Sequence, residues 1–372
     1  MPDDFETRFR AAADAATGGV FWHPRRTPAE VLRAAAEAAE QLDLDWDRYG
    51  SGGALAMVET QLAGLFGAPE AAFFPSGVMA QQCALRVWAD RAGTSRIAIP
   101  ELSHLLVHED DGPRRLHGFE FEYLSRGQAL PTVDDLQAIP GRLAACLLEL
   151  PLRDAGCALP TWDDLVELTS AVRERGAAVH VDGARIWEAQ PHWDRPLSEV
   201  MTLADTLYVS FYKGLGAIAG AALIGPADVI EEARLWRRRM GGTIFHLTAE
   251  AVTALLGLER ELPAMAERRA WARAVAAALT ERGVQCQPDP PHTSTFLVHA
   301  QGSAEAVNER LLGWVEEHRT LLCGAWREGA TPGTVMNELV VAGPATERDP
   351  DQVAGWLAEI ALGTKRTYVL HS

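Results

Sequence analysis

The chain has 372 residues, of which 48% are hydrophobic and 23% charged, so it can bury a large core and is expected to form one large domain and a smaller one. Its 34 basic and 51 acidic side chains give a formal charge of −17, which argues against a nucleic-acid or anionic-membrane partner. The start has no basic segment followed by an apolar one, and no stretch approaches about 18 apolar residues, so we expect a cytoplasmic protein. The five cysteines are scattered without a CxxC pair, which predicts reduced thiols and no metal site.

Between about residues 55 and 225, short apolar runs alternate with helical patterns. This alternation predicts an α/β fold with a mostly parallel sheet covered by helices on both faces. Several runs end in Pro, Asp, Lys or Gly, which would place polar groups at the carboxyl ends of strands, where open α/β sheets bind ligands. The runs are AAFFP (71–75), RIAIP (96–100), AACLLEL (144–150), AAVHVDGA (177–184), TLYVSFYK (206–213) and AGAALIG (219–225).

The pattern becomes helical after Pro226. Apolar residues recur at helical spacing between Thr248 and Gly283, which predicts a long helix linking two domains. From about residue 284, the strand-like runs TFLVHA and NELVVAG are interleaved with helical segments, as in a small α+β domain. The predicted organisation is an N-terminal arm and helix at 1–45, a large domain at 46–260 and a small C-terminal domain at 261–372.

Lysine is rare in this chain. Only Lys213 and Lys365 occur, and the other 32 basic residues are arginine. A guanidinium stays protonated, whereas a desolvated lysine amine can lose its proton and attack an aldehyde. Lys213 follows a strand-like run and opens the segment KGLGAIAGAALIG, whose small residues let a bulky group approach the backbone, while Lys365 lies in the polar tail TKRTYVLHS. Lys213 is therefore the candidate for a catalytic amine.

Asp182 ends a predicted strand just before Gly183, 31 residues before Lys213. This separation suits the ends of neighbouring strands joined by a crossover. A carboxylate against the pyridine nitrogen of pyridoxal 5′-phosphate (PLP) keeps that nitrogen protonated, so that the ring can accept electrons from a substrate carbanion. Arg185, three residues further on, is placed to lie near the ring oxygen. The acid and the lysine together predict a PLP enzyme with a Schiff base on Lys213.

The segments HVDGARIWEA and SFYKGLGAIAGAALIG resemble the threonine aldolases and related β-eliminating lyases of PLP fold type I, the aspartate aminotransferase-like fold. The resemblance includes residues 49–82, 103–112 and 234–259 and covers most of 45–262. It implies a large domain with a mostly parallel sheet sandwiched by helices, a small α+β C-terminal domain, and a homodimer or homotetramer. It also implies a lyase of amino acid metabolism that cleaves a β-hydroxy-α-amino acid to glycine and an aldehyde.

The resemblance gives roles to further residues. Ser76, Gly77 and Val78 would lie at a helix N-terminus whose amides hold the cofactor phosphate. His104 would stack on the pyridine ring and join Lys213 and Asp182 as a catalytic residue. Tyr49, in YGSGG, matches a position near the substrate.

Four substrate- or phosphate-facing positions depart from the family pattern. Glu338 stands where an arginine would bind the substrate carboxylate, which reverses the charge. Leu152 and Arg153 replace the end of a Glu-Asn-Thr-His-like run whose histidine contacts the substrate hydroxyl. FWHPRRTP (21–28) replaces an Arg-Ser-Asp-Thr-like run, and Phe245 replaces an arginine after a Gly-Gly turn. The candidates for a relocated carboxylate contact are Arg153, Arg25 and Arg26, and those for a general base are His23 and His246.

These departures predict retained cofactor chemistry with an altered substrate pocket. β-Elimination or transamination of another amino acid stays open, because the bond that breaks is the one held perpendicular to the ring, and the anchors that orient the substrate have changed. A non-catalytic PLP-fold binding or regulatory module is the alternative from another class. Lys213 and Asp182 count against this module, and Glu338 counts for it.

Overall fold

The computed structural model describes residues 5–363, so Lys365 and its polar tail lie outside the described residues. The chain forms two compact units. The first, here called the sheet unit, consists of residues 27–264, and the second, the C-terminal unit, of residues 5–26 and 265–363. The domain limits expected after residues 45 and 260 stay a prediction.

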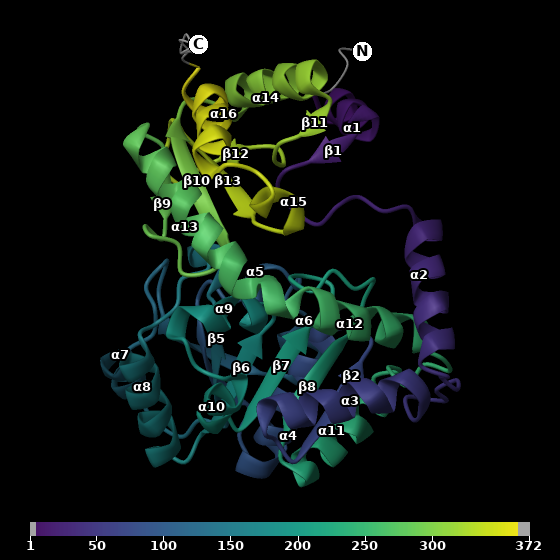
Figure 1. The fold of residues 1–372 in the computed structure, drawn as a ribbon. Helices are drawn as coiled ribbons and strands as arrows, with labels where there is room; N and C mark the ends of the chain where they lie inside the picture. Colours follow the sequence, from purple (N-terminus) through teal and green to yellow (C-terminus); the bar gives the residue numbers. More distant parts are fainter. Residues whose placement is uncertain (1–4, 364–372) are drawn as a thin grey trace. The chain divides into compact units, whose positions relative to one another are not determined.

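The sheet unit is built on a seven-stranded sheet with the order β2-β8-β7-β6-β5-β3-β4 (Figure 1). β7, β6, β5, β3 and β4 pair in parallel, and β8 is antiparallel to both of its neighbours, which confirms the mostly parallel sheet. The sequence missed only β4 in this sheet, because this edge strand exposes Glu120 and Tyr123 and so has no continuous apolar run. The strands are β2 (Glu70–Phe74), β3 (Arg96–Pro100), β4 (Glu120–Ser125), β5 (Ala145–Glu149), β6 (Ala178–Gly183), β7 (Thr206–Ser210) and β8 (Ala221–Gly225).

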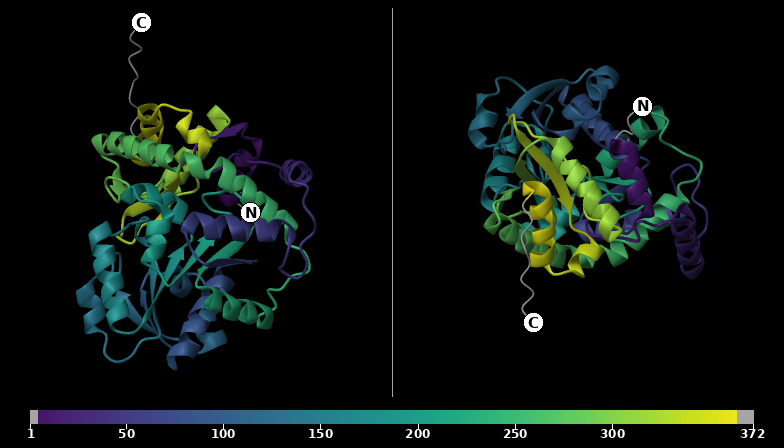
Figure 2. Two further views of the ribbon diagram at one scale, coloured as in Figure 1. Left: turned by 60° about the horizontal axis from the view of Figure 1, so that its bottom comes forward. Right: turned by 90° about the horizontal axis from the view of Figure 1, so that it is seen from above.

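Helices lie on both sides of this sheet (Figures 1 and 2). Helix α4 contacts β8, β7, β6 and β5, and α11 packs beside it. Phe74, Tyr208 and Leu223 are buried in the resulting core, so one face of the sheet is sealed by α4 and α11. The helices of the unit are α2 (Pro28–Gln41), α3 (Gly53–Phe66), α4 (Gly77–Ala92), α5 (His104–Val107), α6 (Gly112–His117), α7 (Val133–Ala138), η1 (Arg153–Ala155), α8 (Trp162–Glu174), α9 (Ile186–Trp193), α10 (Leu197–Thr202), α11 (Ala227–Arg239), α12 (Thr248–Arg260) and η2 (Leu262–Ala264).

The C-terminal unit has its own four-stranded antiparallel sheet, in the order β12-β13-β10-β9, and a two-stranded parallel pair, β1 with β11. Phe296, Leu311 and Leu357 belong to its buried core. This architecture confirms the small α+β fold. The elements are α1 (Phe5–Ala15), β1 (Gly18–Gly19), α13 (Met265–Glu281), β9 (Gln285–Gln287), β10 (Thr295–Gln301), α14 (Ala304–His318), β11 (Thr320–Leu321), β12 (Arg327–Glu328), β13 (Thr334–Val340), α15 (Gly343–Thr346) and α16 (Pro350–Leu362).

The prediction of one long helix between Thr248 and Gly283 is wrong. Helix α12 ends at Arg260, a short 3-10 turn follows at Leu262–Ala264, and α13 begins at Met265. Pro263 lies inside this turn and has no backbone N–H to donate, so it interrupts the hydrogen-bond ladder that the apolar spacing alone would continue.

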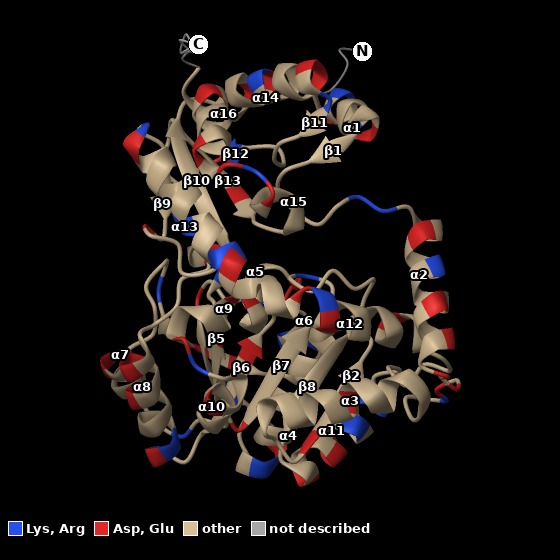
Figure 3. Cartoon of the chain, viewed as in Figure 1, with Lys and Arg blue, Asp and Glu red and all other residues tan. Residues whose placement is uncertain are grey.

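Acidic side chains are prominent on helices α2, α7 and α8 (Figure 3). Across residues 5–363, no helix combines the length and the apolar character needed to span a bilayer. The same residues hold no cluster of three or more His, Cys, Asp or Glu side chains arranged for a metal ion.

Candidate active site

The candidate site begins with a row of three polar side chains across neighbouring strands. Glu149 on β5 is in register with Asp182 on β6, and Asp182 is in register with Tyr208 on β7. Register partners in adjacent strands point to the same face of a sheet, so the three side chains are neighbours. Glu149 and Asp182 lie at the carboxyl ends of their strands, where open α/β sheets place their ligands.

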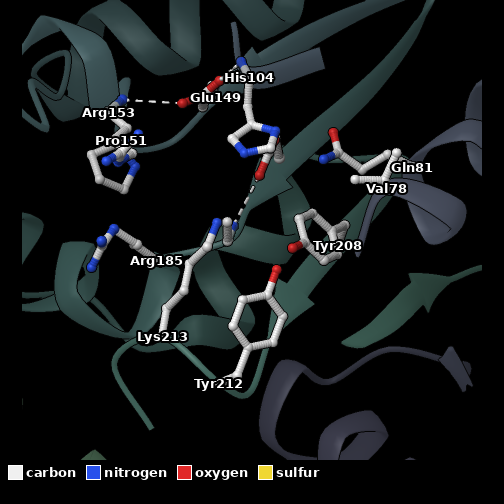
Figure 4. A pocket seen from close by; sticks show the side chains of 12 residues that line it. Val78, Gln81, His104, Glu149, Pro151, Arg153, Arg185, Tyr208, Tyr212 and Lys213 are labelled. Carbon is white, nitrogen blue, oxygen red and sulfur yellow. Dashed lines mark hydrogen bonds between the residues drawn. The ribbon is translucent and has the colours of Figure 1, made fainter. Parts of the chain in front are cut away.

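A pocket opens beside this row (Figure 4). All of its lining residues belong to the sheet unit. They are Val78, Gln81, His104, Glu149, Pro151, Arg153, Asp182, Ala184, Arg185, Tyr208, Tyr212 and Lys213.

Lys213 follows the end of β7, in the connection to β8. Its side chain extends into the pocket between those of Arg185 and Tyr212 (Figure 4). Burial lowers the pKa of the Lys213 amine, the Asp182 carboxylate raises it, and the Arg185 guanidinium lowers it again. A lowered pKa increases the fraction of neutral amine, which is the nucleophilic form.

Asp182 is 1% exposed. Its Oδ1 accepts a hydrogen bond from the Ala184 amide at 3.0 Å, and the Gln81 side chain also donates to the carboxylate. Burial raises the pKa of Asp182, while Lys213 and the two donors lower it. The residue is therefore a buried acid whose charged form is supported by specific partners.

Glu149 is a site residue that the sequence reasoning missed. Its Oε2 accepts the His104 amide at 2.9 Å and its Oε1 accepts the Arg153 amide at 3.1 Å (Figure 4). Burial, followed by the charge of neighbouring Asp182, raises the pKa of Glu149 to about 8. Two adjacent buried carboxyls avoid double ionisation in this way. A signal was available, since Glu149 is the next-to-last residue of the predicted strand AACLLEL (144–150), and Asp182 likewise lies near the end of its own.

His104 begins the short helix α5 after β3. Its ring lies across the pocket from the end of the Lys213 side chain (Figure 4). Burial and the positive charge of Lys213 lower the pKa of His104 to about 4. At neutral pH the ring is therefore uncharged, which suits stacking on another aromatic ring.

The start of α4 forms another side of the site. Ser76 is the N-cap, and its hydroxyl accepts the Met79 amide at 3.3 Å, while the Gly77 and Val78 amides belong to the first turn, which has no intrahelical acceptors. A Cβ at Gly77 would lie 2.0 Å from the Tyr208 hydroxyl oxygen. Only glycine therefore lets Tyr208 pack against the first turn of α4.

Two arginines complete the wall. Arg185 is 6% exposed and donates to Glu188 Oε1 at 2.9 Å, so its charge is paired in the interior. Arg153 lies in the 3-10 turn after β5, with Nη1 at 3.4 Å from Asp154 Oδ1. The pocket thus carries one deeply buried guanidinium and one that is 30% exposed.

The structure brings Lys213, Asp182, His104, Val78, Arg185 and Arg153 around one pocket, with Ser76 and Gly77 directly before Val78. Tyr49 is not among the lining residues. Its ring packs against Phe245 at a centroid distance of 5.1 Å, and its amide donates to the Phe245 carbonyl. The substrate role expected for Tyr49 stays a prediction.

The remaining candidates have other settings. His246 donates through Nδ1 to the Asp47 carbonyl in the sheet unit. In the C-terminal unit, Arg25 pairs with Asp14 at 2.7 Å, and Glu338 lies on β13 in register with Leu297. His23 and Arg26 also belong to the C-terminal unit. Their proposed roles stay predictions.

PLP fits the donors of this pocket. The site offers a buried amine for its aldehyde, a buried carboxylate for its ring nitrogen, an uncharged histidine ring for stacking and a helix start for its phosphate. Gln81 Oε1 is in addition a buried acceptor without a hydrogen-bond partner within residues 5–363.

The fold and this pocket define the class of PLP-dependent enzymes of fold type I. The beta-eliminating lyase family model matches residues 27–303, and the chain belongs to this family of PLP-dependent lyases that act on amino acids. The chain is 26% identical over 313 residues to low-specificity L-threonine aldolase 1 of Arabidopsis thaliana, an alignment that covers 79% of this chain and 84% of the relative.

Two solved structures are similar over nearly the whole chain. One is described as an aromatic amino acid beta-eliminating lyase/threonine aldolase from Exiguobacterium sp. 255-15, with 34% identity, a TM-score of 0.89, and coverage of 95% of this chain and 99% of that chain. The other is described as an L-allo-threonine aldolase from Listeria monocytogenes EGD-E, with 31% identity, a TM-score of 0.88, and coverage of 96% and 99%.

Proposed function

We propose that this chain cleaves the Cα–Cβ bond of a β-hydroxy-α-amino acid, releasing glycine and an aldehyde, and that Lys213 is the amine that holds PLP. The observation that carries the proposal is the convergence of Lys213, Asp182 and His104 on one pocket in a chain of the β-eliminating lyase family. When bound, PLP supplies an electron sink for the bond that breaks.

The residues of the chain divide the remaining work. Lys213 is desolvated, which favours the neutral amine that attacks the cofactor aldehyde. Asp182, held by Ala184 and Gln81, would keep a proton on the pyridine nitrogen. Burial raises the pKa of both Glu149 and Asp182; the charge of Asp182 raises that of Glu149 further, whereas Lys213 and the Ala184 and Gln81 donors lower that of Asp182 and so favour its charged form.

Other side chains would orient the cofactor and the substrate. The uncharged His104 ring would stack on the pyridine ring, and the Gly77 and Val78 amides, with Ser76, would hold the phosphate. Arg185 would lie near the ring oxygen. Arg153, 30% exposed on the wall, would contact the substrate carboxylate.

An altered substrate pocket is part of the proposal. Pro151 and Arg153 line the wall that follows β5, and Leu152 between them is buried and does not line the pocket. A wall with a guanidinium and a proline ring favours a different substrate from one with a histidine. A homodimer or homotetramer is the expected assembly, and light scattering would measure it.

Borohydride trapping tests the role of Lys213. Since the chain has only two lysines besides its N-terminal amine, reduction in the presence of PLP followed by peptide mass mapping assigns the adduct to one of three primary amines. We expect the adduct on the Lys213 peptide of the wild type and of the matched control Lys365→Ala, and its loss in Lys213→Ala. An adduct that survives in Lys213→Ala would refute the assignment.

Product analysis tests the reaction. Glycine and an aldehyde support aldol cleavage, ammonia and a keto acid would show β-elimination, and transfer of the amino group to the cofactor would show transamination. A protein that binds PLP but turns over no amino acid would instead be a binding module.

A further inference from the structure

A histidine–carboxylate pair beside the pocket has no role in the scheme above. His108 Nε2 lies 2.7 Å from Asp154 Oδ2. His108 is the residue at which α5 ends, and Asp154 lies in the 3-10 turn after β5, so the pair joins two separate loops. The His108 side chain is 34% exposed and Asp154 is 16% exposed. The pair is therefore ordered by a short contact and still accessible.

Both loops also supply the wall of the pocket. The His104 ring, which lines the pocket, has its centroid 5.1 Å from that of His108. Arg153, also a lining residue, lies 3.4 Å from the other oxygen of Asp154. Glu149 fixes the backbone of both loops, because it accepts the His104 and Arg153 amides. The pair is thus held where the two wall-forming loops meet, next to the lining residues His104 and Arg153 but not itself among them.

Aldol cleavage needs a base for the β-hydroxyl proton, and the amine, the two carboxylates and the imidazole that line the pocket are already engaged. Lys213 would hold the cofactor, both oxygens of Glu149 accept amides, and Asp182 accepts Ala184 and Gln81. His104 Nδ1 lies 3.1 Å from Glu109. With its pKa lowered to about 4, the His104 ring is also a weak base at neutral pH.

We propose that His108 is the base that accepts the β-hydroxyl proton of the substrate and that Asp154 positions it, an inference that rests on the function proposed above. Because a carboxylate only accepts hydrogen bonds, Asp154 fixes a proton on Nε2 and leaves the lone pair on Nδ1. The proton passes from the hydroxyl to Nδ1, and the oxygen forms the aldehyde carbonyl as the Cα–Cβ bond breaks. The electron pair of that bond goes to Cα, and PLP, when bound, would supply the sink for it.

The charged and titratable groups near His108 include His104, Glu109 and Asp110 on its own loop and Arg153 and Asp154 on the facing one. Lys213, which follows β7, also acts on His104 and Glu109. A substitution at Asp154 removes the partner that bonds directly to the ring, while the others stay in place.

The test uses the PLP-loaded enzyme and the variants His108→Gln and Asp154→Asn, with His318→Gln as the matched control. His318 lies in the C-terminal unit, stacked on Trp314. Two reactions are measured: aldehyde release from a β-hydroxy amino acid, and exchange of the α-proton of glycine with deuterated water, which needs no β-hydroxyl base. Nitrogen-15 NMR of labelled histidine reports the His108 tautomer in the protein without cofactor.

We expect His108→Gln to lower kcat for aldehyde release about 10²- to 10⁴-fold, the usual contribution of a general base, with glycine exchange within about threefold of wild type. Asp154→Asn should lower aldehyde release about tenfold or more and remove the Nε2–H tautomer signal, and His318→Gln should change neither reaction. Equal loss of both reactions in His108→Gln would show a structural role and overturn the proposal, as would unchanged aldehyde release. A wild type that exchanges glycine but releases no aldehyde would overturn the proposed function and the base with it.

Discussion

The substitution Glu149→Gln isolates the carboxyl that joins the two wall-forming loops. Glu149 accepts the His104 and Arg153 amides through separate oxygens. A glutamine side chain has one acceptor oxygen, and its NH₂ group can only donate, so one buried amide loses its partner. An unsatisfied buried donor costs about 1–3 kcal/mol, which is the loss in unfolding free energy expected near pH 6.

The pH dependence of this loss is diagnostic. The pKa of Glu149 is raised from 4.5 to about 8 in the folded protein, so its contribution to stability is complete below pH 4.5 and is lost as the pH rises to about 8. Between pH 6 and pH 8 the wild type should lose roughly 2 kcal/mol through this group. Glutamine has no proton to release in this range, so the stability of the variant should not change through this position. The difference in unfolding free energy between wild type and variant should therefore shrink by about that amount from pH 6 to pH 8.

Urea unfolding at pH 6 and pH 8, followed by circular dichroism, measures both effects. The matched control is Glu231→Gln, an exposed position on α11 where we expect a change within about 0.5 kcal/mol at either pH. A difference between wild type and Glu149→Gln that is the same at the two pH values would refute the reasoning, because Glu149 would then be ionised in the folded protein throughout.

Three further predictions concern other parts of the chain. Gly77→Ala places a Cβ 2.0 Å from the Tyr208 hydroxyl oxygen, so the start of α4 must shift. We expect PLP binding, measured by equilibrium dialysis, to weaken at least tenfold. Unchanged binding would show that the start of α4 can move freely. Burial lowers the pKa of His180 from 6.5 to about 3, so the free energy of unfolding falls as the pH drops below 6.5, by about 2 kcal/mol at pH 5. In acid unfolding experiments, His180→Asn should show a correspondingly smaller loss of unfolding free energy. A loss identical to that of the wild type would contradict this reasoning. Glu309→Gln breaks an exposed ion pair with Arg8 and should change the free energy of unfolding by less than about 1 kcal/mol, so a larger change in urea titrations would mean that α1 depends on this pair.

The type of fold and the chemical core of the site could be predicted from the sequence. The apolar runs of the large sheet are local, and each was readable because a buried strand must be apolar along its length. Lys213 and Asp182 could be recognised because each lies at the end of such a run. Lys213 was the clearer candidate, because lysine is almost absent from the chain. The edge strand β4 was missed because its exposed residues break that pattern.

Which side chains meet in the site could not be predicted, because it depends on how distant segments pair in three dimensions. The register of β5 with β6 makes Glu149 and Asp182 neighbours, and strand register is set by pairing between segments that are distant in sequence. The contact between His108 and Asp154 joins residues 46 positions apart on two loops, so no local pattern contains it. Likewise, the long apolar pattern after Thr248 hid a break that Pro263 imposes. The spacing of apolar residues along the chain predicts individual helices and strands. The burial and charge of a side chain in the site depend instead on which helices, strands and loops are brought together in space.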